Sequence, residues 1–235
     1  MSKTAVILAG GKGTRLRPYT VVLPKPLMPI GEFPILEVII RKITKSGFDR
    51  IILAVNHQAD IIKAYFGDGS KWNISIEYSL ESIPLSTMGP LRLINNLPDD
   101  FLIMNGDVLS NVDFSELFNL HRSSKNTFTV SGFNRVLKSE YGVLEVDDKN
   151  YLSNFKEKPT YDLTVSMGIY VASKEILKYI PEGVPYGFDN LMLDLMKAGT
   201  PAYVHLHKGY WLDIGRPDDY MQAIDDVASG KIVIE

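Results

Sequence analysis

Three closely spaced glycines near the start of the chain are the first feature that could do chemistry. Gly10, Gly11 and Gly13 follow an apolar, β-branched segment that ends at Leu8, a pattern typical of a buried parallel strand. Because glycine has no Cβ atom, backbone N–H groups at these positions can approach a phosphate closely. A buried strand that runs into a glycine-rich loop predicts a site for a phosphorylated ligand.

Hydroxyl and cationic side chains follow the glycines. Thr14, Arg15 and Arg17 contribute one hydroxyl and two guanidinium groups, which suit phosphate oxygens. Lys25, between two prolines, adds a further positive charge. In open α/β sheets, ligands bind outside the carboxyl ends of the strands. We therefore expect a polyphosphate site at that edge of an α/β sheet.

Two common phosphate-binding motifs are excluded by single positions. The dinucleotide fingerprint needs a third glycine where this chain has Leu16. The P-loop needs Ser or Thr after Gly-Lys, whereas Gly11-Lys12 is followed by Gly13. The missing third glycine also argues against an NAD-dependent oxidoreductase.

The elements that must position this loop alternate along the chain. Apolar and β-branched segments predict strands, and apolar residues with a period near 3.6 predict helices. Strands are expected at 4–8, 51–55, 74–78, 101–104, 128–133, 141–146, 151–156, 165–171 and 203–206, and helices at 35–46, 59–66, 88–97, 174–179, 190–197 and 217–227. This order predicts an α/β fold with a Rossmann-like, mixed but mostly parallel sheet flanked by helices.

Composition and length restrict the class of protein. The chain has 235 residues, of which 45% are hydrophobic and 23% charged, so we expect one globular domain spanning residues 1–235. The net charge of −3 predicts neither a nucleic-acid partner nor binding to a membrane. With no cysteine, the chain has no disulfide, thiolate zinc site or cysteine nucleophile, and with no apolar leader a cytoplasmic location is expected.

The loop, written G-G-x-G-T-R-L-x-P and followed by P-K-P, resembles the signature of the sugar-1-phosphate nucleotidyltransferases, also called nucleotide-sugar pyrophosphorylases. The resemblance implies the nucleotide-diphospho-sugar transferase fold, with a nucleotide-binding half at about 1–125 and a sugar-phosphate-binding half at about 126–235. It also implies attack by the phosphate of a sugar 1-phosphate on the α-phosphorus of a nucleoside triphosphate, with loss of pyrophosphate. A phosphate monoester is largely dianionic near neutral pH, so this nucleophile needs no general base.

The same resemblance assigns roles around the loop. Leu8, the three glycines and Thr14 would contact the nucleotide. Arg15 would bind the β- and γ-phosphates and stabilise the departing pyrophosphate, and Lys25 would stabilise charge around the α-phosphate. These are positioning and electrostatic roles, which suit phosphoryl-type transfer.

Two distant aspartates are candidates for holding Mg²⁺. Asp107 lies in M-N-G-D-V-L, just after a predicted strand, and Asp213 lies in a W-x-D-x-G-x-P segment. In the family that the chain resembles, both positions hold the metal, and Mg²⁺ commonly uses one or two carboxylates with substrate phosphates. From the residues alone, Asp107 could instead cap a turn and Asp213 a helix, while Trp211 could line the site or pack in the core.

The sugar phosphate would be bound by the second half of the chain. Gly142 lies in a Y-G-V segment, and Glu157 and Lys158 lie in an E-K-P segment, which the resemblance assigns to sugar hydroxyls and sugar phosphate. Gly168 lies in a segment usually written N-x-G-I-Y, where this chain departs by having Ser166. Without the resemblance, the Glu-Lys pair would be interpreted as a solvated surface pair.

The segment 81–91 resembles the family's base-binding loop, usually written E-x-x-P-L-G-T-A-G-P/A-L. Glu81, Thr87 and Gly89 are retained as nucleotide-binding candidates, whereas Ser86 replaces a glycine and Met88 an alanine. Both changes are expected to add bulk near the base. The alternative is a plain helix start capped by Thr87.

The resemblance favours GTP as the nucleotide and mannose 1-phosphate, or a related heptose or hexosamine 1-phosphate, as the sugar. Uridylyl, thymidylyl and cytidylyl transfer, to glucose 1-phosphate or another phosphorylated acceptor, remain alternatives because one sequence does not reveal base selection. A non-catalytic nucleotide-sugar sensor is a further alternative. Such a protein would tend to lose a metal aspartate or the P-K-P lysine, and this chain keeps both. A homo-oligomer, dimer or tetramer, is expected.

Overall fold

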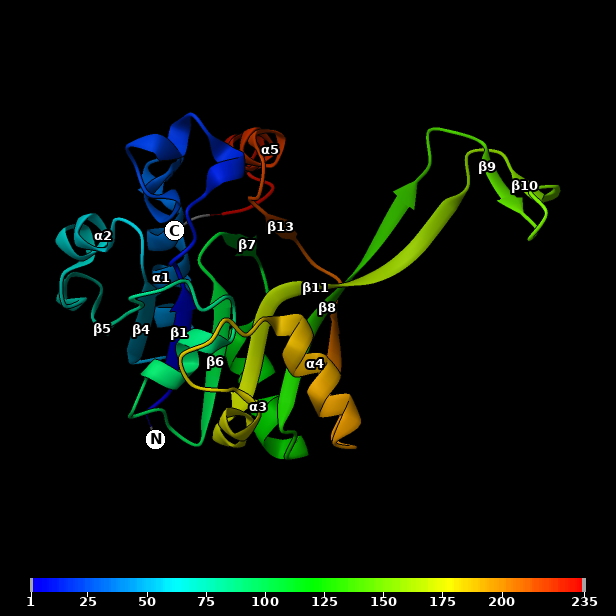
Figure 1. Cartoon of the computed structure of the whole chain (residues 1–235). Helices are drawn as coiled ribbons and strands as arrows, with labels where there is room; N and C mark the ends of the chain where they lie inside the picture. Colours follow the sequence, from blue (N-terminus) through cyan, green and yellow to red (C-terminus); the bar gives the residue numbers. More distant parts are fainter. Residues whose placement is uncertain (1, 234–235) are drawn as a thin grey trace.

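The centre of the molecule is a seven-stranded sheet (Figure 1), and the computed structural model describes residues 2–233. The strand order is β12-β8-β11-β6-β1-β4-β5. β1 pairs in parallel with β4 and β6, β4 with β5, and β8 with β12, while β11 is antiparallel to β6 and β8. The predicted mixed, mostly parallel sheet is therefore confirmed. The bounds are β1 Thr4–Leu8, β4 Arg50–Val55, β5 Ser75–Leu80, β6 Asp100–Asn105, β8 Phe128–Lys138, β11 Thr160–Ser173 and β12 Tyr203–His207.

Helices cover both faces of this sheet, as the all-apolar central strands require. In β1, Ala5 and Ile7 pack in one core and Val6 in the other, and all three are fully buried. The first core includes side chains of α1, α2, α3 and α5, and the second includes those of α4. The helices are α1 Ile35–Lys45, α2 Ala59–Phe66, α3 Phe114–Ser124, α4 Phe188–Lys197 and α5 Pro217–Ala228. No helix within residues 2–233 is long and apolar enough to cross a bilayer.

Two helical segments differ from the prediction. The helix expected at 88–97 is only a short 3-10 segment, Gly89–Leu93, because Pro98 disfavours a helical conformation in the residue before it and the N–H groups of Met88 and Gly89 both donate to the carbonyl of Tyr186. The segment expected at 174–179 is also a 3-10 helix. Conversely, α3 was not predicted, although Asp113 caps it by accepting from two backbone N–H groups.

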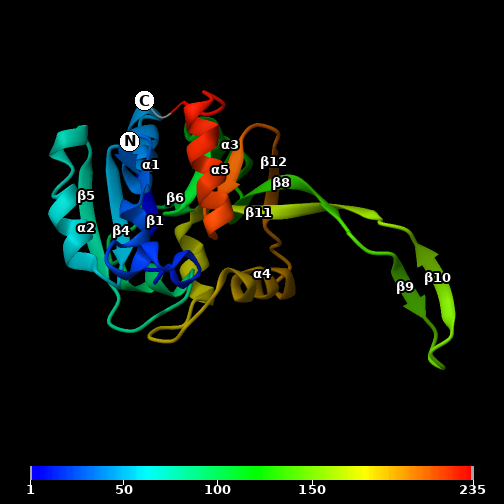
Figure 2. The same ribbon diagram turned by 90° about the horizontal axis from the view of Figure 1, so that it is seen from above.

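A long arm leaves the sheet, as Figures 1 and 2 show. The outer parts of β8 and β11 continue as a two-stranded ribbon, and a hairpin of β9 (Val143–Val146) and β10 (Leu152–Lys156) lies at its end. We call residues 134–164 the arm. Two more short strand pairs lie outside the main sheet: β2 (Pro29–Ile30) with β3 (Phe33–Pro34), and β7 (Val108–Ser110) with β13 (Trp211–Asp213).

Candidate active site

The glycine-rich loop begins where β1 ends, between its two parallel neighbours. The N–H of Ala9 donates to the carbonyl of Ala54 at 2.8 Å, and the N–H of Gly106 donates to that of Leu8 at 3.0 Å. These bonds prolong the ladders by one residue beyond the ends of β1 and β6. The loop and the residues after β6 therefore meet at the carboxyl edge of the sheet, where α/β folds bind ligands.

Lys25 and Asp107 form an ion pair at this edge. Lys25 begins a 3-10 turn after Pro24, whose extended conformation directs the chain back towards the sheet, and it is only 9% exposed. One carboxylate oxygen of Asp107 accepts from the Lys25 ammonium, and the other, Oδ1, is buried with no hydrogen-bond partner. A buried carboxylate oxygen without a hydrogen-bond partner destabilises the fold unless a ligand contacts it.

The β7–β13 pair brings Asp213 beside Asp107. Asp213 is paired with Val108, and the N–H of Ile214 donates to the carbonyl of Asp107 at 3.0 Å. Burial and the nearby charge of Asp107 raise the pKa of Asp213, while Lys25 and Arg15 act in the opposite direction. Two neighbouring carboxylates form a place where a divalent cation would be stabilised.

The donor set fits Mg²⁺ that is shared with a substrate. Within residues 2–233, no group of three or more His, Cys, Asp or Glu side chains could hold a metal. Asp107 and Asp213 are the two carboxylates that would hold such an ion, since Mg²⁺ bound to a nucleoside triphosphate commonly uses one or two carboxylates with phosphate oxygens and water. The unpartnered Oδ1 of Asp107 is the atom best placed to contact such an ion.

A cavity of about 340 Å³ lies next to this carboxylate. Its lining comes from the loop, from the ends of β4 and β6, and from segment 81–90 (Leu8, Gly10, Gly11, Lys12, Asn56, Glu81, Pro84, Ser86, Thr87, Pro90, Asn105 and Asp107). A Cβ atom on Gly10 would lie 2.8 Å from Oε1 of Glu81, so glycine is required for this close approach. Burial raises the pKa of Glu81, whose Oε2 accepts from the N–H of Leu85 at 3.0 Å.

Segment 81–91 contributes less bulk to the cavity than the sequence suggested. Met88 is fully buried in the second core, so the expectation that it crowds the base is wrong. Gly89 is buried too, and a Cβ atom there would lie 2.9 Å from that of Leu85, so its role is to let the loop pack. Ser86 lines the cavity with a positive φ of 64°, a conformation that favours glycine.

Arg15 faces a second cavity of about 420 Å³ on the Asp213 side, which Trp211 also lines. Gly13 makes the turn that precedes it: its φ is +60°, its carbonyl accepts from Thr20 Oγ1 at 2.7 Å, and Thr14 follows it at an exposed position. A Cβ atom on Gly215 would lie 3.4 Å from the Arg15 guanidinium, so the arginine lies against the segment that carries Asp213.

Gly168 lies behind the nucleotide cavity, in a bulge of β11. Its φ is +72°, and a Cβ atom there would lie 2.6 Å from Nδ2 of Asn105, which lines the cavity. Trp211 donates from Nε1 to the carbonyl of Met167 at 3.0 Å and packs on Phe133, so it fixes the bulge as well as lining the site. Sequence reasoning missed Asn56 and Asn105, although each directly follows or ends a strand beside β1.

Gly142, Glu157 and Lys158 lie on the arm instead. They are mutually close, since a Cβ atom on Gly142 would lie 3.1 Å from Oε2 of Glu157, and all three are exposed. The arm extends away from the sheet (Figure 2), and neither cavity of the site includes them among its described lining. The structure therefore places Gly168 beside the cavity that Asp107 lines, but it does not bring Gly142, Glu157 and Lys158 to that cavity in the same chain.

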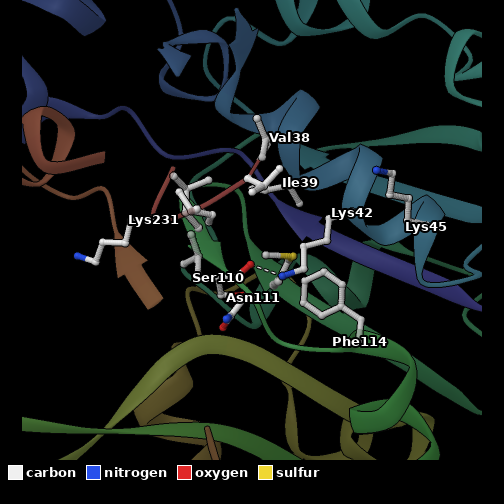
Figure 3. A pocket seen from close by; sticks show the side chains of 13 residues that line it. Val38, Ile39, Lys42, Lys45, Ser110, Asn111, Phe114 and Lys231 are labelled. Atoms are coloured by element: carbon white, nitrogen blue, oxygen red, sulfur yellow. Dashed lines mark hydrogen bonds between the residues drawn. The ribbon is translucent and has the colours of Figure 1, made fainter. Parts of the chain in front are cut away.

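Another cavity, of about 440 Å³, lies between α1, β7 and α3 (Figure 3). Lys42 donates to the carbonyl of Ser110 there, and burial lowers the pKa of Lys42 to about 8. Its described lining includes none of the predicted site residues. It is lined by all three residues of β7 but not by Asp107, and we treat it as distinct from the candidate site.

The sequence profile of the nucleotidyl transferase family matches residues 4–230. The chain belongs to this family. The match covers both the loop after β1 and the segment that carries Asp213, so the two parts of the candidate site fall inside the family's domain.

Two curated relatives and one solved structure that this chain resembles have names that point to different substrates. A UTP–glucose-1-phosphate uridylyltransferase of Synechocystis is 35% identical to this chain, and the match covers 97% of this chain and 64% of the relative. A mannose-1-phosphate guanylyltransferase of Mycobacterium tuberculosis is 32% identical, and the match covers 96% of this chain and 65% of that relative. The crystal structure of HddC from Yersinia pseudotuberculosis in complex with GMP-PN superposes with a TM-score of 0.71 at 27% sequence identity. The superposition covers 95% of this chain and 99% of HddC. The chain spans slightly less than two thirds of those two curated relatives.

Proposed function

We propose that this chain transfers a nucleoside monophosphate from a nucleoside triphosphate to a sugar 1-phosphate. The observation that carries the proposal is the Lys25–Asp107 ion pair beside Asp213, with one carboxylate oxygen left unpartnered at the edge of the nucleotide cavity. Family membership supports the reaction class. The arrangement supplies positive charge and metal-binding oxygen atoms, which is what an in-line reaction between two polyanions requires.

Each part of the site has a defined role in this proposal. The loop at Gly10 and Gly11 lets the backbone approach the triphosphate, and Arg15 neutralises the β- and γ-phosphates as pyrophosphate leaves. Lys25 holds Asp107 in place and stabilises charge that develops on the α-phosphate. Mg²⁺ bound by Asp107 and Asp213 would neutralise triphosphate oxygens. The attacking sugar phosphate is already an anion, so no residue is needed to remove a proton.

We propose GTP as the nucleotide and mannose 1-phosphate, or a related heptose or hexosamine 1-phosphate, as the acceptor. The mannose-1-phosphate guanylyltransferase relative and the HddC structure with GMP-PN support this choice. The uridylyltransferase relative, which is slightly more identical, supports UTP and glucose 1-phosphate as the second candidate. Because selection between bases depends on a few hydrogen bonds in the pocket, Glu81, Asn56 and Thr87 are the side chains that we expect to make it.

A substrate grid tests the proposal. Pyrophosphate release is measured with Mg²⁺ for GTP, UTP, dTTP, CTP and ATP, each with mannose, glucose, glucosamine and heptose 1-phosphates. We expect the highest kcat/KM with GTP and a manno-configured sugar. A higher value for UTP with glucose 1-phosphate would replace the substrate assignment but keep the reaction. Nucleotide binding without pyrophosphate release from any pair would overturn the reaction.

A further inference from the structure

The hairpin at the end of the arm has an uncovered apolar face. Val146 pairs with Leu152 and Leu144 with Phe155, so the side chains of each pair lie on the same face of the hairpin. Leu144, Val146 and Leu152 are 62%, 57% and 61% exposed. A two-stranded hairpin without cover is at best marginally stable in water, and a contiguous apolar patch normally marks a contact surface.

The ribbon that carries the hairpin has an apolar face as well. Leu137 pairs with Tyr161, and both are largely exposed, while Leu163 on the same face is 45% exposed. Towards the sheet, Phe133 continues this row and lines the cavity that contains Arg15 and Asp213. Arg135, which pairs with Leu163 between Leu137 and Phe133, interrupts the apolar row on β8 with a charge and lines the same cavity. This face of the ribbon therefore leads to the rim of the candidate site.

The arm's own geometry keeps it from folding back onto its own cavity. The pairing of β8 and β11 runs without a bulge from Ser166 with Gly132 to Thr160 with Lys138, and the register shifts only nearer the sheet, between Ser166 and Tyr170. Sharp bends in a ribbon occur at bulges, because elsewhere they break ladder hydrogen bonds. An unbroken ladder holds the hairpin away from the sheet, as both views of the chain show (Figures 1 and 2).

A matching apolar surface lies beside the nucleotide loop. Tyr19, Val21 and Val22 are 52%, 60% and 79% exposed, and they lie in and just after the turn between Arg15 and Lys25. Solvent-exposed apolar side chains clustered at the rim of a polar site are typical of a contact surface. The chain thus carries two uncovered apolar surfaces, one on the arm and one at the site that lacks the arm's residues.

We propose that two copies of this chain exchange arms, so that each arm covers the other copy's nucleotide cavity and supplies Glu157 and Lys158 to it. A two-fold axis places both arms equivalently and buries the apolar faces of both hairpins. This inference rests on the proposed function for the role of Glu157 and Lys158 in binding the sugar phosphate. The complete site is then composite: Lys25, Asp107 and Asp213 come from one copy, and the sugar-phosphate residues come from the other.

Mixed dimers test whether the site is shared. One copy carries Lys25→Ala and the other carries Lys158→Ala, with different affinity tags, and mixed dimers are purified through both tags. Exchanged arms give each mixed dimer one intact site of two, so turnover per dimer should return to about half the wild-type value. If each site is built from one chain, the mixed dimer keeps only the residual activity of its parents, and the proposal is overturned. A mixture of Lys25→Ala with Asp107→Ala is the matched control and recovers nothing in either case.

Sedimentation tests the arm contact independently of activity. The wild-type protein is expected to be a dimer. The double variant Val146→Asp with Leu152→Asp is expected to be a monomer, and its circular dichroism spectrum should match that of the wild type. The control is the double variant Leu193→Asp with Met196→Asp. These two side chains are 55% and 66% exposed on α4, and this variant should stay dimeric. A monomeric wild type, or a dimer that survives the arm substitutions, would overturn the proposal.

The two experiments separate this inference from the proposed function. If wild type shows no nucleotidyl transfer but the arm variant alone loses the dimer, the arm contact stands and the reaction fails. If wild type is active and Lys158→Ala is fully active too, the assignment of Lys158 to the sugar phosphate fails, while sedimentation still decides whether the arm joins two copies.

Discussion

Lys25 and Asp107, 82 positions apart in the sequence, form an ion pair at the carboxyl edge of the sheet and leave Oδ1 of Asp107 without a partner. The lysine thus fixes one oxygen of the carboxylate and keeps the other available. Removing Lys25 should loosen Asp107 and remove charge stabilisation at the α-phosphate.

We expect Lys25→Ala to lower kcat by about 10²–10³, the scale for loss of one preorganised electrostatic group. Pyrophosphate release at saturating substrate measures it. Lys197→Ala is the control, since this exposed lysine on α4 pairs only with Asp194 nearby. A Lys25→Ala enzyme within about twofold of wild type would exclude the proposed role, because loss of a transition-state contact must appear in kcat.

Gly168 and Gly199 have almost the same positive φ, +72° and +69°, but different surroundings. A Cβ atom would collide with Asn105 at Gly168 and would meet open space at Gly199. Both alanine substitutions should lower the free energy of unfolding, measured with urea, by about 1–2 kcal/mol, because a residue with a Cβ atom is disfavoured in the left-handed conformation. Only Gly168→Ala should also weaken nucleotide binding, by about tenfold, because Asn105 must move in the cavity. Equal nucleotide affinity of the two variants would contradict the position given to Asn105.

The raised pKa of Asp213 predicts how stability depends on pH in the absence of metal. The folded state binds this proton more tightly than the unfolded state, so the stabilising contribution is present at low pH. It is lost as pH rises from the ordinary aspartate range through the raised pKa. Asp213→Asn cannot ionise, so the melting temperature of this variant relative to wild type should increase between pH 4 and 7 in EDTA. Asp225→Asn, at an exposed position on α5, should show no such trend; a flat difference for Asp213→Asn would refute the electrostatic account.

Ser86 adopts a positive φ of 64° at a position where glycine has less steric cost. Ser86→Gly should therefore stabilise the fold by about 0.5 kcal/mol, the left-handed penalty less the backbone entropy that glycine loses. Ser82→Gly, in the same loop but without a positive φ, should lose stability. Chemical unfolding of the two variants measures both effects, and destabilisation by Ser86→Gly would show that its hydroxyl is needed in the loop.

The sheet was predictable because its central strands are short, continuous apolar runs, and because parallel strands between helices must be buried on both faces. The position of Lys25 near Asp107 follows from the same logic, since β1 and β6 end at one edge. The Asp107–Asp213 approach was implied only by the family resemblance. The residue pattern itself does not predict it, because β7 and β13 are only three residues long and carry no periodic signal. α3 was missed although Asp113 caps it.

The arm is a second feature of the structure that the sequence did not predict. The sequence predicts strands at 128–133 and 165–171, and in the structure these continue into the arm as Phe128–Lys138 and Thr160–Ser173. A period of two does not say whether a strand stays in its sheet or leaves it. The E-K-P and Y-G-V segments were expected to bind the sugar phosphate, and the structure places them on the arm, away from the glycine-rich loop. Where these residues act depends on the partner surface, which a single chain does not contain.

The most direct test of the central claim is a Mg²⁺ titration of pyrophosphate release, made with the best substrate pair for wild type, Asp107→Asn and Asp213→Asn. The account predicts no release in EDTA, saturable release by wild type as Mg²⁺ is added, and turnover lowered by about 10² or more in both variants. Release by wild type that is unaffected by EDTA, or variants that saturate with Mg²⁺ as wild type does, would contradict the claim that these two carboxylates hold the metal and the triphosphate.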